Sequence, residues 1–281
     1  MKKLFLKLSL FFLCLLWILF LYKSFFNQKS AWFFYVERTM ADKQDQKILT
    51  QDKFGRQVVF ELFSMNLRTD EFNEKIQKLS EVYGKAFLAP IKALLKDYSF
   101  IFSNIKFYKK FNKLMVINDF KESERRSVEI KACKDLAQHF IDVETVISSD
   151  VSTWVVVAKD KETDLILGFL EFSLYKKASA RSIRVEIIAF LPEVQHLGLG
   201  KLILSSIFKF LPETKRITLG VLKSNLNAIK AYNSYGFVMC EPEKEWSNID
   251  ELDSFRINLE YDVERSDSLQ KDAHNKLKFV C

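Results

Sequence analysis

The order of apolar and polar residues in the second half of the chain predicts a series of buried strands with one amphipathic helix among them. The strands are short apolar runs, and the helix repeats its apolar residues near a 3.6-residue period. Glu186 is the one charge inside the third strand, which Pro192 ends because proline cannot supply a sheet hydrogen bond. The segments are strands at 153–158, 165–175 and 185–190, a helix at 201–211, and strands at 217–222, 238–240 and 255–261.

The first half of the chain predicts one strand followed by helices. Residues 57–65 alternate as a strand does, and residues 70–88 place apolar side chains on one side of an amphipathic helix. Pro90 is expected to end that helix, after which another begins. Residues 98–150 begin with a very aromatic stretch. This stretch predicts helices packed on a sheet rather than a membrane-facing or substrate-binding surface, and a helix is expected at 128–147.

The N-terminal segment has the character of a membrane anchor. Residues 8–22 carry no charge and consist mostly of leucine, phenylalanine and tryptophan. Extended to residue 26, the run approaches the roughly twenty residues that a membrane-spanning helix needs. A cleaved signal peptide is the alternative, but the small-x-small pattern of a cleavage site is missing. We therefore expect a single-pass membrane protein that is held through residues 8–26.

The chain is expected to divide into four parts. These are a transmembrane or signal-anchor segment at 1–30, a polar linker at 31–56, one α/β (α+β) domain at 57–263 and a polar, frayed tail at 264–281. Part of the linker, residues 38–56, could instead form an exposed hairpin. A chain of 281 residues, 48% of them hydrophobic, has enough apolar side chains to bury a core.

Charge and cysteine content exclude two classes of site. The formal net charge is +7, but lysines and acids are interspersed, and no basic stripe with aromatic residues predicts nucleic-acid binding. The cysteines stand at positions 14, 133, 240 and 281, with no close pair and no CxxC motif. A metal site is therefore not expected, and reduced thiols fit better than a disulfide framework.

A glycine-containing turn joins the strand at 185–190 to the helix that follows. Gly198 and Gly200 stand where that helix begins. The first N–H groups of a helix have no partner inside it, the helix dipole is positive there, and glycine lets a ligand approach the backbone. Such a turn favours a phosphate or pyrophosphate. Taken alone, however, it could equally be an ordinary strand-to-helix turn.

A second motif follows the strand at 217–222. A helix cap is expected near Ser224 and Asn225, an apolar stripe continues the helix, and glycine stands at the usual stop position. With the turn, this segment resembles the GNAT superfamily of N-acyltransferases. The family's acetyl-CoA loop, Arg/Gln-x-x-Gly-x-Gly/Ala, is matched by Gln195, Gly198 and Gly200. Its later pattern, Asn-x-x-Ala-x-x-x-Tyr-x-x-x-Gly-Phe, is matched by Asn225, Ala228, Tyr232, Gly236 and Phe237.

The resemblance implies the GNAT fold, a central mixed, twisted sheet flanked by helices, over residues 57–263 with its motif core at 153–240. It also implies acetyl-CoA as co-substrate. The N–H groups of the loop would bind the pyrophosphate, and the strand edge near Phe190 would hold the pantetheine arm. His196 departs from the family, which often has glycine there. The implied acetyl-CoA-binding residues are Phe190, Leu191, Gln195, His196, Leu197, Gly198, Leu199, Gly200, Lys201 and Asn225.

The same resemblance suggests two catalytic residues. Glu186 matches the position at which many family members have a glutamate that takes a proton from the acceptor amine; alternatively it pairs with Arg184 or Arg181. Tyr232 matches the family's general acid near the CoA sulfur; alternatively it is a core tyrosine on the helix stripe.

Two functions are therefore considered. The first is a membrane-tethered N-acetyltransferase that acts on an amine of an unidentified small molecule, peptide or protein. The second is a catalytically inactive GNAT-like module that serves membrane-bound interactions. The intact loop and helix motifs favour the first. Basic residues flank the apolar segment almost equally and slightly favour an N-terminus inside the cell, which would export the domain. Acetyl-CoA, by contrast, is normally cytosolic, so we expect a domain facing the cytoplasm.

Overall fold

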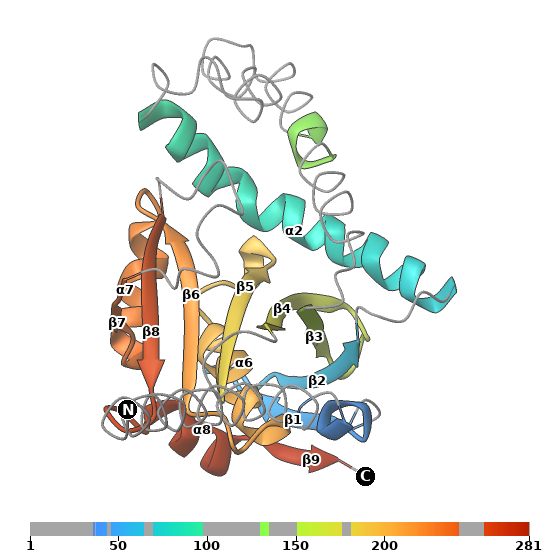
Figure 1. Cartoon of the computed structure of the whole chain (residues 1–281). Coiled ribbons are helices and arrows are strands. Elements are labelled where there is room, and N and C mark those ends of the chain that lie inside the picture. Colours follow the sequence, from blue (N-terminus) through green and yellow to red (C-terminus); the bar gives the residue numbers. More distant parts are fainter. Residues whose placement is uncertain are drawn as a thin grey trace, which may run out of the picture.

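The computed structural model of the chain describes residues 36, 38–43, 46–64, 70–97, 130–134, 151–175, 181–241 and 256–280. Within these residues the strands form one mixed sheet in the order β7-β8-β6-β5-β4-β3-β2-β1-β9 (Figure 1). Among the described strands only β5 and β6 run parallel. The sheet consists of β1 (Lys47–Gln51), β2 (Gln57–Ser64), β3 (Val151–Asp160), β4 (Ile166–Tyr175), β5 (Ser182–Phe190), β6 (Arg216–Leu222), β7 (Val238–Met239), β8 (Arg256–Asp262) and β9 (Lys278–Val280).

Helices flank this sheet. They are α2 (Asp70–Asp97), α6 (Leu199–Phe210), α7 (Leu226–Tyr235) and α8 (Ser268–Lys276), with a short 3-10 turn, η3 (Pro192–Val194), between β5 and α6. In Figure 1 the long helix α2 crosses the sheet near β5 and β4, while α6 lies behind β5. β3 and β4 are buried along most of their length; β3 has an unbroken apolar run from Trp154 to Ala158, whereas β4 buries Glu171 and Ser173 among its apolar residues.

The core lies between the sheet and its helices. Phe169 and Phe172 of β4 and Ile203 and Ile207 of α6 are fully buried. Such side chains are worth roughly 1.5–3 kcal/mol each when removed from water. The structure confirms several predicted elements, with ends shifted by a few residues: the strands at 153–158, 165–175, 185–190 and 217–222 and the helix at 201–211. They could be predicted because their buried apolar side chains recur at the spacing of a strand or a helix.

The predicted helix break at Pro90 is wrong. α2 runs continuously from Asp70 to Asp97. A proline inside a helix costs about 3 kcal/mol through one lost hydrogen bond and a steric clash. Packing outweighs this cost, because Ile76, Leu79 and Val82 of the same helix are buried against the sheet.

The sheet extends beyond the predicted domain, residues 57–263, at both ends. β1 lies inside the predicted linker 31–56 and pairs with β2 as a hairpin. The predicted polar tail 264–281 contains α8 and β9, and β9 pairs with the far side of β1. The tail looked frayed because its few apolar residues are scattered. Leu269, Ala273 and Leu277 are nevertheless four residues apart and all buried, which is the spacing of one helix face.

Some predictions concern segments that the structure does not describe. Residues 130–134 are helical, within the helix expected at 128–147, and the remainder of 98–150 is outside the described residues. The predicted anchor, residues 8–26, is also outside them. No helix in the described part of the chain has the length and apolarity to cross a membrane.

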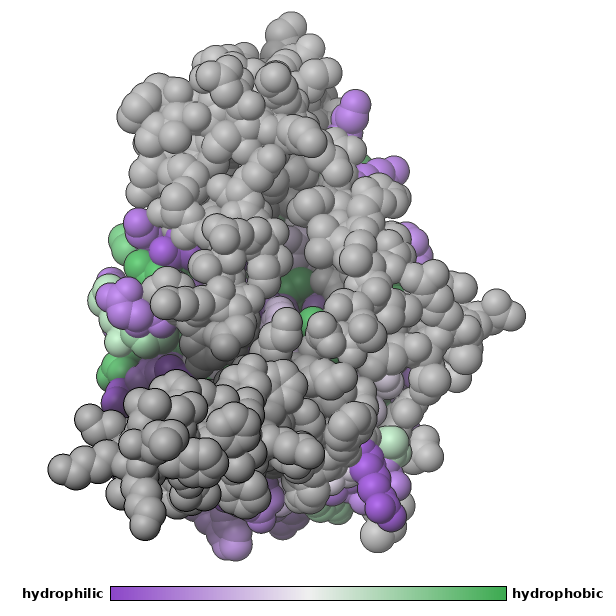
Figure 2. Space-filling view, in the orientation of Figure 1, coloured by the Kyte–Doolittle hydropathy of each residue, from purple (hydrophilic) through white to green (hydrophobic). Residues whose placement is uncertain are grey.

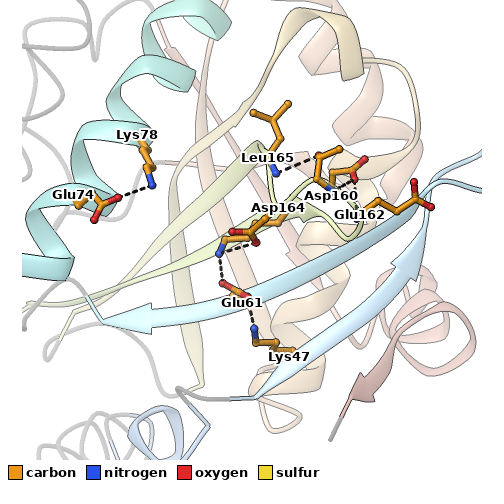
Figure 3. Close-up of polar contacts among 10 residues, drawn as sticks. Lys47, Glu61, Glu74, Lys78, Asp160, Glu162, Asp164 and Leu165 are labelled. Carbon is orange, nitrogen blue, oxygen red and sulfur yellow. Dashed lines mark hydrogen bonds and ion pairs between the residues drawn. The ribbon is translucent and has the colours of Figure 1, made fainter.

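Ion pairs between side chains, as well as backbone hydrogen bonds, join β1, β2 and β3 (Figure 3). Glu61 of β2 reaches Lys47 of β1 at 2.7 Å and Lys159 of β3 at 2.8 Å. Next to this cluster a cavity of about 610 Å³ lies between β2, β3 and the first turns of α2. None of the acetyl-CoA-binding or catalytic residues that the sequence predicts lines this cavity.

Apolar side chains are exposed at the opposite edge of the sheet. Figure 2 shows hydrophobic residues at the left margin of the molecule, where Figure 1 places α7 and β7. Leu226, Val238 and Met239 are the large apolar residues exposed on these two elements.

Candidate active site

The site begins where β5 and β6 separate. The two strands pair only from Ser182–Arg216 to Val185–Leu219, although β5 continues to Phe190. Beyond Val185 the β6 side of β5 therefore has no strand partner in the described sheet. Unpaired backbone N–H and C=O groups on a strand edge can bind an extended ligand that carries amides.

A β-bulge places Glu186 at this separation. On β4 Glu171 faces Ile187 and the next residue, Phe172, faces Val185, so Glu186 is the extra residue on β5. Bulges re-aim a side chain and are common beside active sites. The Glu186 side chain is 24% exposed, and Arg184 Nε lies 3.1 Å from its Oε2. Of the two expected pairing partners Arg184 is present, whereas Arg181 lies 3.6 Å from Glu213 instead.

Two further residues at the bulge were not anticipated from the sequence. The Tyr175 hydroxyl donates to Oε1 of Glu186 at 2.8 Å. Burial and the nearby Glu186 carboxylate raise the pKa of Tyr175, so its hydroxyl stays protonated and keeps this bond. Glu171, 2% exposed, adds a second buried carboxylate next to the bulge. Their positions depend on the β4–β5 register, which no local pattern in the sequence specifies.

The loop after β5 is fixed at both of its ends. Gln195 Nε2 donates to the backbone oxygen of Phe190 at 3.1 Å, which ties the predicted loop residue to the predicted strand residue. The backbone oxygen of Leu197 accepts from the N–H of Lys53, in the β1–β2 turn, at 3.2 Å. His196 has φ of 64°, a left-handed conformation in which glycine is the least strained residue. This backbone explains the glycine that the family often has there.

α6 begins without a side-chain cap. Its N-cap residue is Gly198, with φ of 84°, and the cap makes no side-chain hydrogen bond. A Cβ added to Gly198 would meet nothing within 4 Å, so the space beside this backbone is open. No side chain caps the first-turn N–H groups of α6, and the space beside Gly198 is open, an arrangement that fits a phosphate group.

Side chains around this first turn hold it in place. Leu199 is 1% exposed and anchors the turn in the core. Leu191, just after β5, is buried as well. Lys201 Nζ lies 2.8 Å from Oδ2 of Asp272 on α8. The C-terminal helix therefore supports the loop from outside the segment that carries the two motifs.

α7 carries the second motif. Asn225 is its N-cap, and Oδ1 of Asn225 accepts from the N–H of Ala228 at 3.2 Å. The Tyr232 ring packs against Tyr235 and Phe237, with centroids 6.4 and 5.6 Å away. Burial raises the pKa of Tyr232, which favours the protonated hydroxyl. No hydrogen bond joins Tyr232 to Glu186 in the described structure, and its packing is compatible with the core-tyrosine alternative.

The loop, the open strand edge and the capped helix all lie in a segment that is similar to a known protein family. Residues 115–237 match the model of the acetyltransferase (GNAT) family. The match includes β3 to α7 and both sequence motifs. It supports an acetyltransferase domain of this family, whose members use acetyl-CoA. No curated protein matches the sequence.

The comparison with solved structures matches several acetyltransferases. One is nourseothricin acetyltransferase, 25% identical over 41% of this chain and 66% of that one, with a TM-score of 0.32. This chain thus spans slightly less than two thirds of that protein. Another is the PaiA N-acetyltransferase of Thermoplasma acidophilum in complex with coenzyme A, 15% identical over 72% and 98% of the two chains, with a TM-score of 0.36. A third is an acetyltransferase of Thermus thermophilus, 14% identical over 46% and 74%, with a TM-score of 0.34.

Proposed function

We propose that this chain is an acetyl-CoA-dependent N-acetyltransferase, with an amine of an unidentified small molecule, peptide or protein as acceptor. The observation that carries the proposal is the uncapped glycine start of α6 beside the unpaired edge of β5. A CoA molecule has a pyrophosphate for the first feature and a pantetheine arm with two amides for the second. Both features lie in the segment that matches the acetyltransferase (GNAT) family.

The predicted loop residues divide by chemistry. Gly198, Leu199, Gly200 and Lys201 would offer backbone N–H groups to the pyrophosphate. Gln195 keeps the loop joined to Phe190, so the strand edge and the loop bind as one unit. Oδ1 of Asn225 caps α7, so the amide N–H groups of the same side chain would be available to the pantetheine arm. We assign no metal to this chemistry, and no group of His, Cys, Asp or Glu in the described residues could hold one.

Glu186 and Tyr232 would perform the proton transfers. When bound, acetyl-CoA supplies an acetyl group that is activated as a thioester. Glu186 takes a proton from the acceptor ammonium, directly or through water, while Arg184 and Tyr175 hold its carboxylate in place. The amine nitrogen then bonds to the acetyl carbon as the carbon–sulfur bond breaks. Tyr232 would give its hydroxyl proton to the departing thiolate, and the second proton that the new amide nitrogen must lose would restore that hydroxyl, directly or through water.

Purified full-length protein, in detergent where needed, tests this function. Calorimetry with acetyl-CoA measures binding, and a panel of amines with free thiol as the readout measures transfer. Binding with amine-dependent thiol release is the expected result. Binding without release from a broad panel would favour the inactive interaction module, and no binding at all would refute the acetyltransferase function.

The location of the protein is a separate part of the proposal. Residues 8–26 would hold the full chain in the membrane as an uncleaved anchor, with the catalytic domain facing the cytoplasm where acetyl-CoA is made. The protein should then stay in the membrane fraction through carbonate washing at its unprocessed mass. A shorter soluble product that starts near residue 30 would identify a cleaved signal peptide instead.

A further inference from the structure

A second tyrosine of α7 lies against the loop that we assign to the pyrophosphate. Tyr235 is the last residue of α7, three residues after Tyr232. Its hydroxyl oxygen lies 3.7 Å from the point that a Cβ on Gly200 would occupy. Gly200 belongs to the uncapped first turn of α6. The hydroxyl of Tyr235 therefore borders the same opening as the N–H groups of that turn.

The position of this side chain is fixed by its surroundings. Gly236 ends α7 in a left-handed conformation, with φ of 99°. Ser268 Oγ, at the start of α8, donates to the backbone oxygen of Tyr235 at 2.6 Å. The ring meets Tyr232 edge-on at 83°. These contacts fix the backbone of Tyr235 and one side of its ring, so the hydroxyl keeps its position next to Gly200.

The hydroxyl itself has no hydrogen-bond partner among the described residues, although the side chain is half-buried. The hydroxyl oxygen is not among the buried side-chain atoms that lack a partner, so it reaches solvent and is accessible to a ligand. Burial also raises the pKa of Tyr235, so the group is a neutral donor at physiological pH. A donor without a protein acceptor, beside backbone N–H groups that also lack one, suits an anionic ligand.

We infer that Tyr235 is a phosphate-binding residue of the acetyl-CoA site, whose hydroxyl donates to a pyrophosphate oxygen at the start of α6. The inference rests on the proposed function and extends it, since the family motif includes only Tyr232 of the two tyrosines. One face of α7 would then serve both ends of the co-substrate. Tyr232 would act at the thioester and Tyr235 at the pyrophosphate.

Tyr235→Phe tests the assignment, because it removes the hydroxyl and keeps the ring. Calorimetry on the full chain would compare CoA, 3′-dephospho-CoA and pantetheine, the last of which has no phosphate. We expect a loss of about tenfold in affinity for both CoA and dephospho-CoA, as for a hydrogen bond to a charged group, and no loss for pantetheine. Ser234→Ala is the matched control, since Ser234 is exposed on the same turn and its hydroxyl donates, among the described residues, only to the backbone oxygen of Ala231.

The dependence on phosphate separates a binding role from a structural one. An equal loss for CoA and pantetheine would place the effect in the general shape of the site and overturn the inference. Unchanged affinity for all three ligands would overturn it as well. If Tyr235→Phe alters turnover and leaves CoA affinity unchanged, Tyr235 is an acid and not a phosphate ligand. Failure of the unmodified chain to bind CoA would refute the proposed function itself.

Discussion

Two helices leave the sheet from the carboxyl ends of neighbouring parallel strands, and their first turns are built differently. α7, after β6, begins at Asn225, whose side chain accepts a hydrogen bond from the helix. α6, after β5, begins at Gly198, which has no side chain to do so. A glycine N-cap typically gives up a few tenths of a kcal/mol relative to a capping side chain. The start of α6 forgoes this stabilisation, and in exchange its N–H groups stay open to a ligand.

The contrast extends to what each helix offers to chemistry. α6 offers backbone groups at its start, supported from behind by Leu199 and Lys201. α7 satisfies its own first turn and offers side chains along one face, Tyr232 and Tyr235. If this division is correct, substitutions in α6 and α7 should fail in different assays.

The largest effect should come from the face of α7. Tyr232→Phe keeps the aromatic packing with Phe237 and removes only the hydroxyl. If Tyr232 is the general acid, turnover should fall by about a hundredfold or more while acetyl-CoA affinity stays near that of the unchanged protein. Steady-state kinetics with any accepted amine, together with calorimetry, measure both quantities. Turnover within a few-fold of the original would make Tyr232 a core residue only.

The start of α6 should respond in binding. Gly198→Val puts a branched side chain into the open space beside the loop and forces valine to φ of 84°. Acetyl-CoA affinity should drop by about tenfold or more, equivalent to about 1.4 kcal/mol, as measured by calorimetry. Gly198→Ala is the control, because it imposes the same φ of 84° on a non-glycine residue with a much smaller side chain. Equal affinity losses in the two variants would mean that backbone strain, and not the ligand site, is responsible.

The start of α7 should respond in stability. Asn225→Ala removes the acceptor that caps the helix and should cost about 1 kcal/mol in the free energy of unfolding, measured by urea denaturation. Asn225→Asp keeps a capping oxygen and should restore most of that stability. The aspartate lacks amide N–H groups, so a remaining loss of acetyl-CoA affinity would report a direct contact with the arm. Full stability in Asn225→Ala would contradict the comparison between the two helices.

The smallest effect concerns the support of α6 by α8. Burial alone would raise the pKa of Asp272, but hydrogen bonds from Lys201 and Lys276 bring it below the ordinary 3.8. The ion pairs therefore stabilise the fold above that pH and lose this contribution as the pH falls through the lower folded value. Asp272→Asn should cost up to about 1 kcal/mol at pH 7. The difference between the two proteins should start to shrink below about pH 4 and continue to shrink as the pH falls through the folded pKa, and a gap that does not change with pH would contradict this origin.

The sequence predicts the central sheet well because its strands are buried on both faces, which leaves unbroken apolar runs such as residues 153–158. It also predicts Asn225 as a cap, since capping depends only on nearby residues. Tyr175 and Glu171 could not be found in this way. Their approach to Glu186 follows from a one-residue shift between β4 and β5, which only the pairing of two strands can create. α8 was missed because its buried positions are few and lie within a polar segment.

The pairing of β1 with β9 has a consequence for how the protein is made. Lys47 is the partner of Val280, so one edge of the sheet joins the first and the last strand of the described sheet. During synthesis β1 can pair only with β2 until residue 280 has left the ribosome, so its other edge stays unpaired until then. Unpaired strand edges are prone to join other chains during such a delay. A chaperone that covers the unpaired edge of β1 during synthesis should therefore raise the yield of folded protein, although β9 itself is only three residues long.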